Sequence, residues 1–170
     1  MEIVKEICLF DIDGVLFDVS ERYLRALTAD PKRGDTFWNI FFSEDLLVLD
    51  KPLEKGVENL RKCLEKNYDI IIVSGRPERL REATLKQLMN IGLLENKDFK
   101  KLILRRNNDI RKSYVFKIEI VKELTKRYVI KEIHDDDLEF LRRVSHIALN
   151  SVLFYYENSC VKILKKLNYF

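Results

Sequence analysis

The sequence predicts an α/β fold in which a parallel sheet is covered by helices on both faces. Apolar segments of strand length alternate along the chain with segments whose apolar residues recur at helical spacing. The strand segments are apolar throughout, which is typical of strands buried on both faces. With 170 residues, 46% of them hydrophobic and 35% charged, the chain can bury a substantial core in one domain.

Short apolar segments, rich in β-branched and aromatic residues, mark the expected strands. They are residues 6–10, 68–73, 102–104, 128–133 and 152–156. Polar residues follow directly after the first, second and fourth of these segments. Because the carboxyl ends of parallel strands meet at one edge of a sheet, and ligands bind beyond that edge, these polar residues are the candidates for a functional site.

Helical segments are expected between the strands. Their ranges are 20–27, 53–64, 77–92, 118–128 and 138–144, and a last helix is expected at 160–168. Ser20 is a suitable N-cap for the first of them. Pro77 suits the first position of the third helix, and Gly92 can end it.

Residues 18–52 interrupt the alternation of strands and helices. Turn signals at residues 30–31 and 34–35 are followed by an aromatic run at 37–42. We therefore expect a single domain, residues 1–170, with a small helical insert, or cap, at about residues 18–52 after the first strand.

Charge and cysteine usage limit the classes of function. The net charge of +3 comes from basic residues spread along the whole chain, so it is compatible with an anionic partner without establishing one. Cys8, Cys63 and Cys160 are odd in number, far apart and without a CxxC pair, which argues against a disulfide framework or a zinc site. Charged residues near the start interrupt any signal-peptide core, and no apolar run approaches the roughly 18 residues of a membrane helix. We expect a cytoplasmic protein that does not enter a membrane.

Acidic residues gather at the expected functional edge. Asp11 and Asp13 follow the first strand, Ser74 follows the second, and Asp135 and Asp136 follow the fourth. Four carboxylates in one crevice repel one another, so some of them must take up protons unless a cation offsets them. Oxygen ligands and partial hydration suit Mg²⁺, and neither a histidine cluster nor a cysteine pair favours zinc.

A cation beside a free carboxylate suits phosphoryl transfer. Asp11 can attack phosphorus, and Asp13, two residues further on the same side of an extended chain, can protonate the leaving oxygen and later activate water. Ser74 and the Gly75 N–H can donate to phosphoryl oxygens. Lys117, in the helical segment before the fourth strand, can complete the charge balance.

The ordered set of DIDGV at 11–15, the SG pair at 74–75, Lys117 and the DD pair at 135–136 resembles the four signature motifs of the haloacid dehalogenase (HAD) superfamily. The resemblance covers nearly the whole chain. It implies a Rossmann-like three-layer α/β/α fold with a mainly parallel sheet, Mg²⁺ dependence and a phospho-aspartyl intermediate.

The resemblance also implies individual roles. It makes Asp11 the nucleophile and Asp13 the general acid/base. The metal ligands that it implies are Asp11, Asp13 through its carbonyl, Asp135 and Asp136, with Asp135 ranked ahead of Asp136. Because the dehalogenase branch usually lacks the second aspartate, Asp13 favours a phosphatase.

A narrower resemblance concerns the substrate. The segments FDIDGVLFDVSER, IIIVSGRPERLREATLKQL and LILRRNNDIRKSYVFK, with the FW..FF insert and the DDD segment, are similar to the phosphatase half of polynucleotide kinase–phosphatases. That group removes phosphate from the 3′ ends of nucleic acid. The sequence holds no GxxxxGK[ST] motif of the kinase half. The resemblance implies a Mg²⁺-dependent phosphomonoester phosphatase whose phosphorylated substrates are DNA or RNA ends.

Two other functions fit the same residues. One is a phosphatase of small metabolites or nucleotides, although a small insert leaves an open site that suits a large substrate. The other is a non-catalytic module that binds phosphate or nucleic acid, which has no need of Asp13.

Several residues have alternative structural roles. Arg76, Arg105, Arg106 and Arg111 suit the binding of a substrate backbone, or form a solvated face. The aromatic residues around Trp38 suit base stacking, or form the core of the insert. In addition, His134 is expected to be a packed or capping histidine, and Asp137 is expected to cap the following helix.

Overall fold

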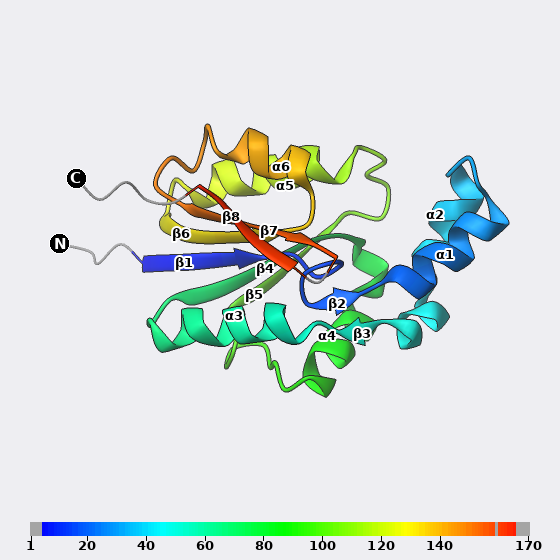
Figure 1. Cartoon of the computed structure of the whole chain (residues 1–170), viewed down its shortest axis with the longest axis horizontal. Coiled ribbons are helices and arrows are strands. Elements are labelled where there is room, and N and C mark those ends of the chain that lie inside the picture. Colours follow the sequence, from blue (N-terminus) through cyan, green and yellow to red (C-terminus); the bar gives the residue numbers. More distant parts are fainter. Residues whose placement is uncertain (1–4, 159, 166–170) are drawn as a thin grey trace.

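A six-stranded sheet, in the order β5-β4-β1-β6-β7-β8, forms the centre of the computed structural model, which describes residues 5–158 and 160–165 (Figure 1). Its strands are β1 (Lys5–Phe10), β4 (Asp69–Pro77), β5 (Lys101–Arg105), β6 (Tyr128–Asp135), β7 (Val152–Glu157) and β8 (Cys160–Lys165). Every pairing is parallel except that of β7 with β8, which is antiparallel. The mainly parallel sheet expected from the sequence is confirmed.

Helices cover both faces of this sheet (Figure 1). On one face lie α3 (Glu54–Glu65) and α4 (Arg81–Asn90), the latter preceded by the 3-10 helix η2 (Glu78–Leu80); on the other lie α5 (Ser113–Leu124) and α6 (Leu138–Val144). Successive strand residues point to opposite faces. Phe10 and Ile72 therefore pack with α3 and α4, whereas Leu9 and Val73 pack with α5 and α6. Burial on both faces explains why these strands are apolar throughout.

The order of the strands places a topological switch point at β1. The chain passes from β1 to β4 and β5 on one side and then returns to β6 on the other side. Phe10, the last residue of β1, pairs with Ile72 of β4 and with His134 of β6. Residues that directly follow β1 and β6 therefore meet in the crevice where α/β sheets bind ligands.

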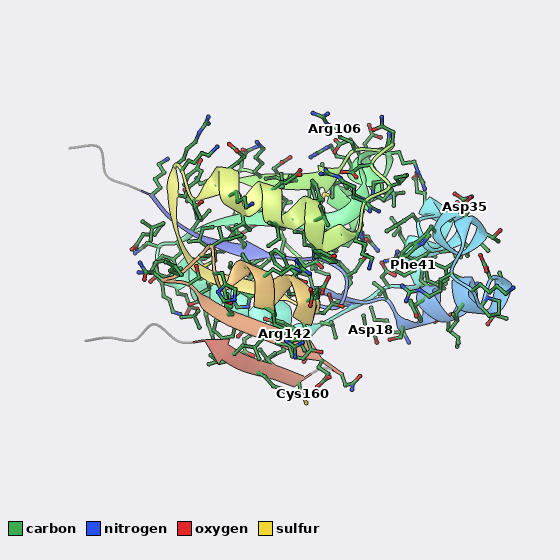
Figure 2. The ribbon with its side chains drawn as sticks, turned by 90° about the horizontal axis from the view of Figure 1, so that it is seen from above. Asp18, Asp35, Phe41, Arg106, Arg142 and Cys160 are labelled. Atoms are coloured by element: carbon green, nitrogen blue, oxygen red, sulfur yellow. The ribbon has the colours of Figure 1, made fainter. Side chains whose placement is uncertain are left out.

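The segment between two short strands, β2 (Phe17–Asp18) and β3 (Lys51–Pro52), projects away from the sheet (Figure 1). It holds α1 (Ser20–Ala29), α2 (Asp35–Phe41) and the 3-10 helix η1 (Glu44–Leu49). Figure 2 shows Asp18, Phe41 and Asp35 along this extension, with Asp18 near its base.

The extension has a small apolar core of its own. Phe37, Phe41 and Phe42 are buried there with Ala26, and Leu80 of η2 joins them from the main body. Trp38 packs on this cluster but keeps 40% of its surface exposed. The aromatic run therefore forms mostly a core, and one large ring remains at the surface.

The prediction of a helix at residues 160–168 is wrong for residues 160–165, the part that the structure describes. Residues Cys160–Lys165 form the edge strand β8, which pairs with β7. Asn158 adopts a left-handed conformation with φ of 49°, and Asn tolerates that conformation at a hairpin turn. After the turn, the backbone of β8, which includes β-branched residues, pairs with β7. This pairing depends on tertiary structure, so the local periodicity of the sequence could not predict it. Residues 166–168 lie outside the described residues.

Some expected boundaries also shift. Ser20 lies inside α1, where the Asp18 carboxylate accepts hydrogen bonds from the backbone N–H and the hydroxyl of Ser20. Pro77 ends β4, and α4 begins only at Arg81. The helix expected at residues 118–128 is α5, which begins and ends earlier.

Helix α3 is held close to the loop after β1 because Gly56 has no side chain. A Cβ atom on Gly56 would lie 1.8 Å from the carbonyl oxygen of Val15. We expect Gly56→Ala to lower the free energy of unfolding by about 1–3 kcal/mol, because α3 or the loop must move, even though alanine favours helices. Urea denaturation measures this change. Lys55→Ala, at the exposed neighbouring position, is the matched control, and equal stability of the two variants would contradict the close packing.

Candidate active site

Asp11 lies at the switch point, immediately after β1. Its backbone N–H donates to the carbonyl of His134 at 2.9 Å, which extends the pairing of β1 with β6 by one residue. One carboxylate oxygen, Oδ1, accepts from the N–H of Ile12 at 2.7 Å, and the other, Oδ2, accepts from Lys117 Nζ at 2.7 Å. These hydrogen bonds hold the side chain, which is 6% exposed, in one position.

Lys117 joins the two central strands. It extends from α5, is 2% exposed, and donates to Oδ2 of both Asp11 and Asp135 at 2.7 Å. Burial opposes its positive charge, but the negative charges of Asp11 and Asp135 outweigh burial and raise the pKa of Lys117 above its ordinary value. The ammonium group therefore stays protonated and neutralises part of the acidic site.

Three carboxylates remain close together despite this lysine. Oxygen atoms of Asp11, Asp135 and Asp136 all lie within 4.8 Å of one another. Burial and the neighbouring carboxylates raise the pKa of Asp11 and raise that of Asp135 to about 7. Asp136 lies on the exposed side of the cluster, and desolvation between these carboxylates raises its pKa well above the usual range. One lysine thus leaves the cluster short of positive charge, and its all-oxygen donor set fits a hard divalent cation such as Mg²⁺.

Gly14 allows the third carboxylate to approach. Its φ of 78° lies in the left-handed region, and a Cβ atom there would stand 2.2 Å from Asp136 Oδ2. Only glycine accommodates both the turn and the neighbouring carboxylate. The glycine of the DIDG sequence is therefore needed for the acidic cluster as well as for the turn.

Asp13 is held by two arginines. Its Oδ1 accepts from Arg76 Nη2 at 2.6 Å, from Arg76 Nε at 2.9 Å and from Arg22 Nη2 at 3.0 Å. Both arginines are 0% exposed. Burial would raise the pKa of Asp13, but Arg76 and Arg22 hold it below its ordinary value. Asp13 and Asp11 thus lie in electrostatically opposite surroundings.

Asp50 completes this arrangement from the other end of the extension. Its two carboxylate oxygens accept from Arg22 Nε at 2.8 Å and from Arg76 Nη2 at 3.0 Å. Gln87 of α4 also donates to Asp50 and accepts from Arg76. We call Asp13, Arg22, Asp50 and Arg76 the arginine clamp. It connects the extension, the loop after β1 and the end of β4.

Arg76 was expected to bind substrate. The structure buries its guanidinium, which donates to Asp13, Asp50, Gln87 and Thr84, so the contacts that it shows are with protein groups. A contact with substrate stays a prediction. Arg22 was missed by sequence reasoning. The sequence held one signal for Arg22: it lies four positions before Ala26, so both residues share the buried face of α1, where a charged residue is unusual.

Ser74 lies at the same edge of the sheet as the aspartates. It is 1% exposed and belongs to β4, two residues beyond Ile72, which pairs with Phe10. Its hydroxyl accepts from the N–H of Arg76 at 3.3 Å. At Gly75 a Cβ atom would lie 2.4 Å from Ser113 Oγ, so glycine lets the start of α5 approach this edge.

The three expected surface arginines differ in what they can bind. Arg111 is paired with Asp109 at 2.7 Å and with Glu119 at 2.6 Å, which offsets its charge. Arg105 donates to the carbonyl of Arg111, and its buried Nε has no partner among the described residues. Arg106 is exposed, and Figure 2 shows it at the molecular surface. Arg105 and Arg106 retain the greater capacity for a substrate anion.

His134 and Asp137 have the structural roles that were expected. His134 is stacked between Phe10 and Phe154 at centroid distances of 4.0 and 4.3 Å, and its Nδ1 lies 2.9 Å from the Tyr156 hydroxyl. Asp137 caps α6 by accepting from two backbone N–H groups of the first turn. Neither residue belongs to the acidic cluster.

Among the described residues, no helix combines the length and the apolar character needed to cross a membrane. This finding leaves the expected cytoplasmic location as a prediction.

Solved structures show which folds are similar. A chain of the Pnkp1/Rnl/Hen1 RNA repair complex is 23% identical, with a TM-score of 0.66 over 91% of this chain and 44% of that one. A second structure of the Pnkp1/Rnl/Hen1 complex gives 20% identity and a TM-score of 0.66 over 93% and 48%. This chain therefore spans less than half the length of those two chains. The class C acid phosphatase of Bacillus anthracis with bound tungstate is 16% identical, with a TM-score of 0.58 over 91% and 68%.

Sequence comparison identifies the family. No curated protein matches the chain. The model of HAD superfamily subfamily IIIB, described as acid phosphatase, matches residues 4–158, which is most of the chain and includes every motif residue. The resemblance to the HAD superfamily is thus confirmed, and with it a phosphatase on a Rossmann-like fold. The chain belongs to the subfamily IIIB acid phosphatases of the HAD superfamily.

Proposed function

We propose that this phosphatase acts through a phospho-aspartyl intermediate on Asp11, with Mg²⁺ as its metal. The observation that carries the proposal is the contrast between neighbouring aspartates. Asp11 faces Lys117 in an acidic cluster suited to a cation, whereas Asp13 is held separately by two arginines. Two carboxylates in different surroundings can take different roles, one as nucleophile and one as acid and base.

In the proposed reaction Asp11 attacks phosphorus, and the bond from phosphorus to the leaving oxygen breaks. Asp13 passes a proton to that oxygen; because Arg76 and Arg22 lower the pKa of Asp13 and keep it ionised in the free enzyme, this proton enters the site on the phosphate of the substrate monoanion. Asp13 then takes a proton from water, whose oxygen attacks the phosphorus on Asp11 and releases phosphate. Ser74, the Gly75 N–H and Lys117 donate to the phosphoryl oxygens throughout.

The acidic cluster would hold the metal. Asp11, Asp135, Asp136 and the Asp13 carbonyl are the proposed ligands, and both oxygens of Asp135 already accept hydrogen bonds from Lys117 and Asp137. When bound, Mg²⁺ neutralises phosphate charge and aligns the phosphoryl group for in-line attack.

The proposed substrate is a 3′-phosphate end of DNA or RNA. The similarity in fold to a chain of an RNA repair complex supports this substrate, as do Arg105 at the end of β5, where it pairs with Pro77 of β4, its neighbour Arg106, and the exposed Trp38 on the extension. The similarity to an acid phosphatase supports the alternative, a small phosphoester. A module that only binds phosphate has no need of two buried arginines on Asp13.

Replacing the proposed nucleophile tests the mechanism. We expect Asp11→Asn to lower Mg²⁺-dependent hydrolysis of p-nitrophenyl phosphate by at least about 10³-fold, because the amide is a poor nucleophile. Circular dichroism should show an intact fold. The matched control is Asp45→Asn, a change of the same kind at an exposed position in η1. Wild-type activity in Asp11→Asn would mean that Asp11 is not the nucleophile.

The arginine clamp makes a second prediction, which depends on the leaving group. We expect Arg76→Gln to misplace Asp13 and so to remove part of the roughly 10²–10⁴-fold contribution of general acid catalysis. The loss of kcat should be large for an alkyl phosphate, whose leaving oxygen needs a proton, and small for p-nitrophenyl phosphate, whose leaving group does not.

Arg25→Gln, on the exposed side of α1, is the control for this variant. Equal losses with both substrates would indicate that Arg76 only stabilises the fold.

A third prediction separates the two substrate classes. We expect a 3′-phosphate oligonucleotide to be hydrolysed with a higher kcat/KM than the 3′-mononucleotide. The oligonucleotide value should also fall with salt, with a logarithmic slope of about −0.7 for each phosphate contacted on a single strand. Arg106→Gln should reduce that slope without changing hydrolysis of the mononucleotide. Equal kcat/KM values that do not respond to salt would favour the small phosphoester.

A further inference from the structure

A second group of potential metal ligands lies within the core, on the α3 side of the sheet. Cys8 of β1, Cys63 of α3 and Glu132 of β6 each offer one ligand atom, and these atoms lie within 4.8 Å of one another. The two cysteines are 0% exposed and Glu132 is 7% exposed. Strand pairing sets Cys8 opposite Glu132, and Cys63 Sγ donates to Glu132 Oε2 at 3.2 Å. We call these three residues the thiol cluster.

The surroundings of Glu132 are unusually polar for this core. Lys66 Nζ donates to Glu132 Oε1 at 2.7 Å, and His134 Nε2 lies 3.0 Å from Glu132 Oε2. A carboxylate beside apolar residues is costly unless it is paired, so these contacts keep it charged. They also orient Glu132 toward the two thiols, as hydrogen bonds from histidine orient carboxylates around metal ions.

We propose that the thiol cluster binds one Zn²⁺ ion, separately from the acidic cluster at the active site. Thiolates and a carboxylate are zinc ligands, and their spacing suits three positions of a tetrahedron, while His134 holds Glu132 from outside the cluster. Mg²⁺ has little affinity for sulfur and does not compete.

Charge balance supports this assignment. Binding replaces the two thiol protons, which leave to solvent, by one divalent cation. Two thiolates and Glu132 then balance Zn²⁺ together with Lys66, so the core gains no net charge. Lys66 is half exposed and pairs with Glu132, so this ion pair connects the thiol cluster to the surface.

Sequence spacing gave no sign of this site. Cys8 and Cys63 belong to no CxxC pair, and the absence of such a pair argued against zinc. Helix α3 returns across the sheet and brings Cys63 beside Cys8. A bound ion would connect β1, β6 and α3, so we expect the Tm to rise with Zn²⁺ concentration.

The test uses the full chain, reduced and freed of metal with EDTA, in saturating Mg²⁺. We expect one Zn²⁺ per chain by equilibrium dialysis, and Co²⁺ in its place should give a sulfur-to-cobalt charge-transfer band. Asp11→Asn should bind the ion as the wild type does, which separates this site from the active site and from the proposed function. Absence of the thiolate band would overturn the proposal.

Variants assign the ligands. We expect Cys63→Ala and Glu132→Gln each to weaken Zn²⁺ binding by more than about 10-fold. Cys160→Ala, on the edge strand β8 (Figure 2), is the matched control and should bind normally. If Cys63→Ala fails to fold, the Zn²⁺ affinity of Glu132→Gln and the Co²⁺ spectrum of the wild type decide whether the thiol cluster binds the ion. Unchanged affinity in Glu132→Gln, with no thiolate band in the wild type, would place the ion elsewhere.

Discussion

The contact of Lys117 with Asp11 and Asp135 is the interaction on which the site depends. It brings α5 against the two central strands and places one positive charge between the carboxylates that follow them. Buried ion pairs contribute little net stability because desolvation opposes them. The arrangement is better understood as a device for holding charged groups where the proposed phosphoryl group and cation would join them. Burial and the nearby Asp11 still raise the pKa of Asp135 despite this lysine.

The arginine clamp has the complementary effect on Asp13. Two buried guanidinium groups lower the pKa of a carboxylate that lies only two residues from Asp11. The clamp also connects the extension to the main body, since Arg22 and Asp50 come from its two ends and Arg76 from β4. The orientation of Asp13, the proposed acid and base, therefore depends on how the extension packs against the main body. The extension contributes none of the three carboxylates of the acidic cluster.

Glycines set how closely these parts approach one another. Gly14 admits Asp136 beside the loop after β1, Gly75 admits Ser113 of α5, and Gly56 admits the carbonyl of Val15. Each contact joins segments that are distant in the sequence. Two of these contacts enclose the short loop after β1, with Asp136 on one side and α3 on the other, and the third brings α5 against the end of β4.

The layered fold and the acidic edge follow from the residue pattern, because apolar strands alternating with helices leave few ways to bury their surface, and polar residues that follow parallel strands converge. Asp11, Ser74 and Asp135 could be predicted for that reason, whereas Lys117 was predicted from charge balance and from the family resemblance. Four features come from packing alone: the partners of Asp13, the burial of Arg76, the strand β8 and the proximity of Cys8 to Cys63. Each of these depends on how distant segments pack, and local periodicity holds no information about that packing.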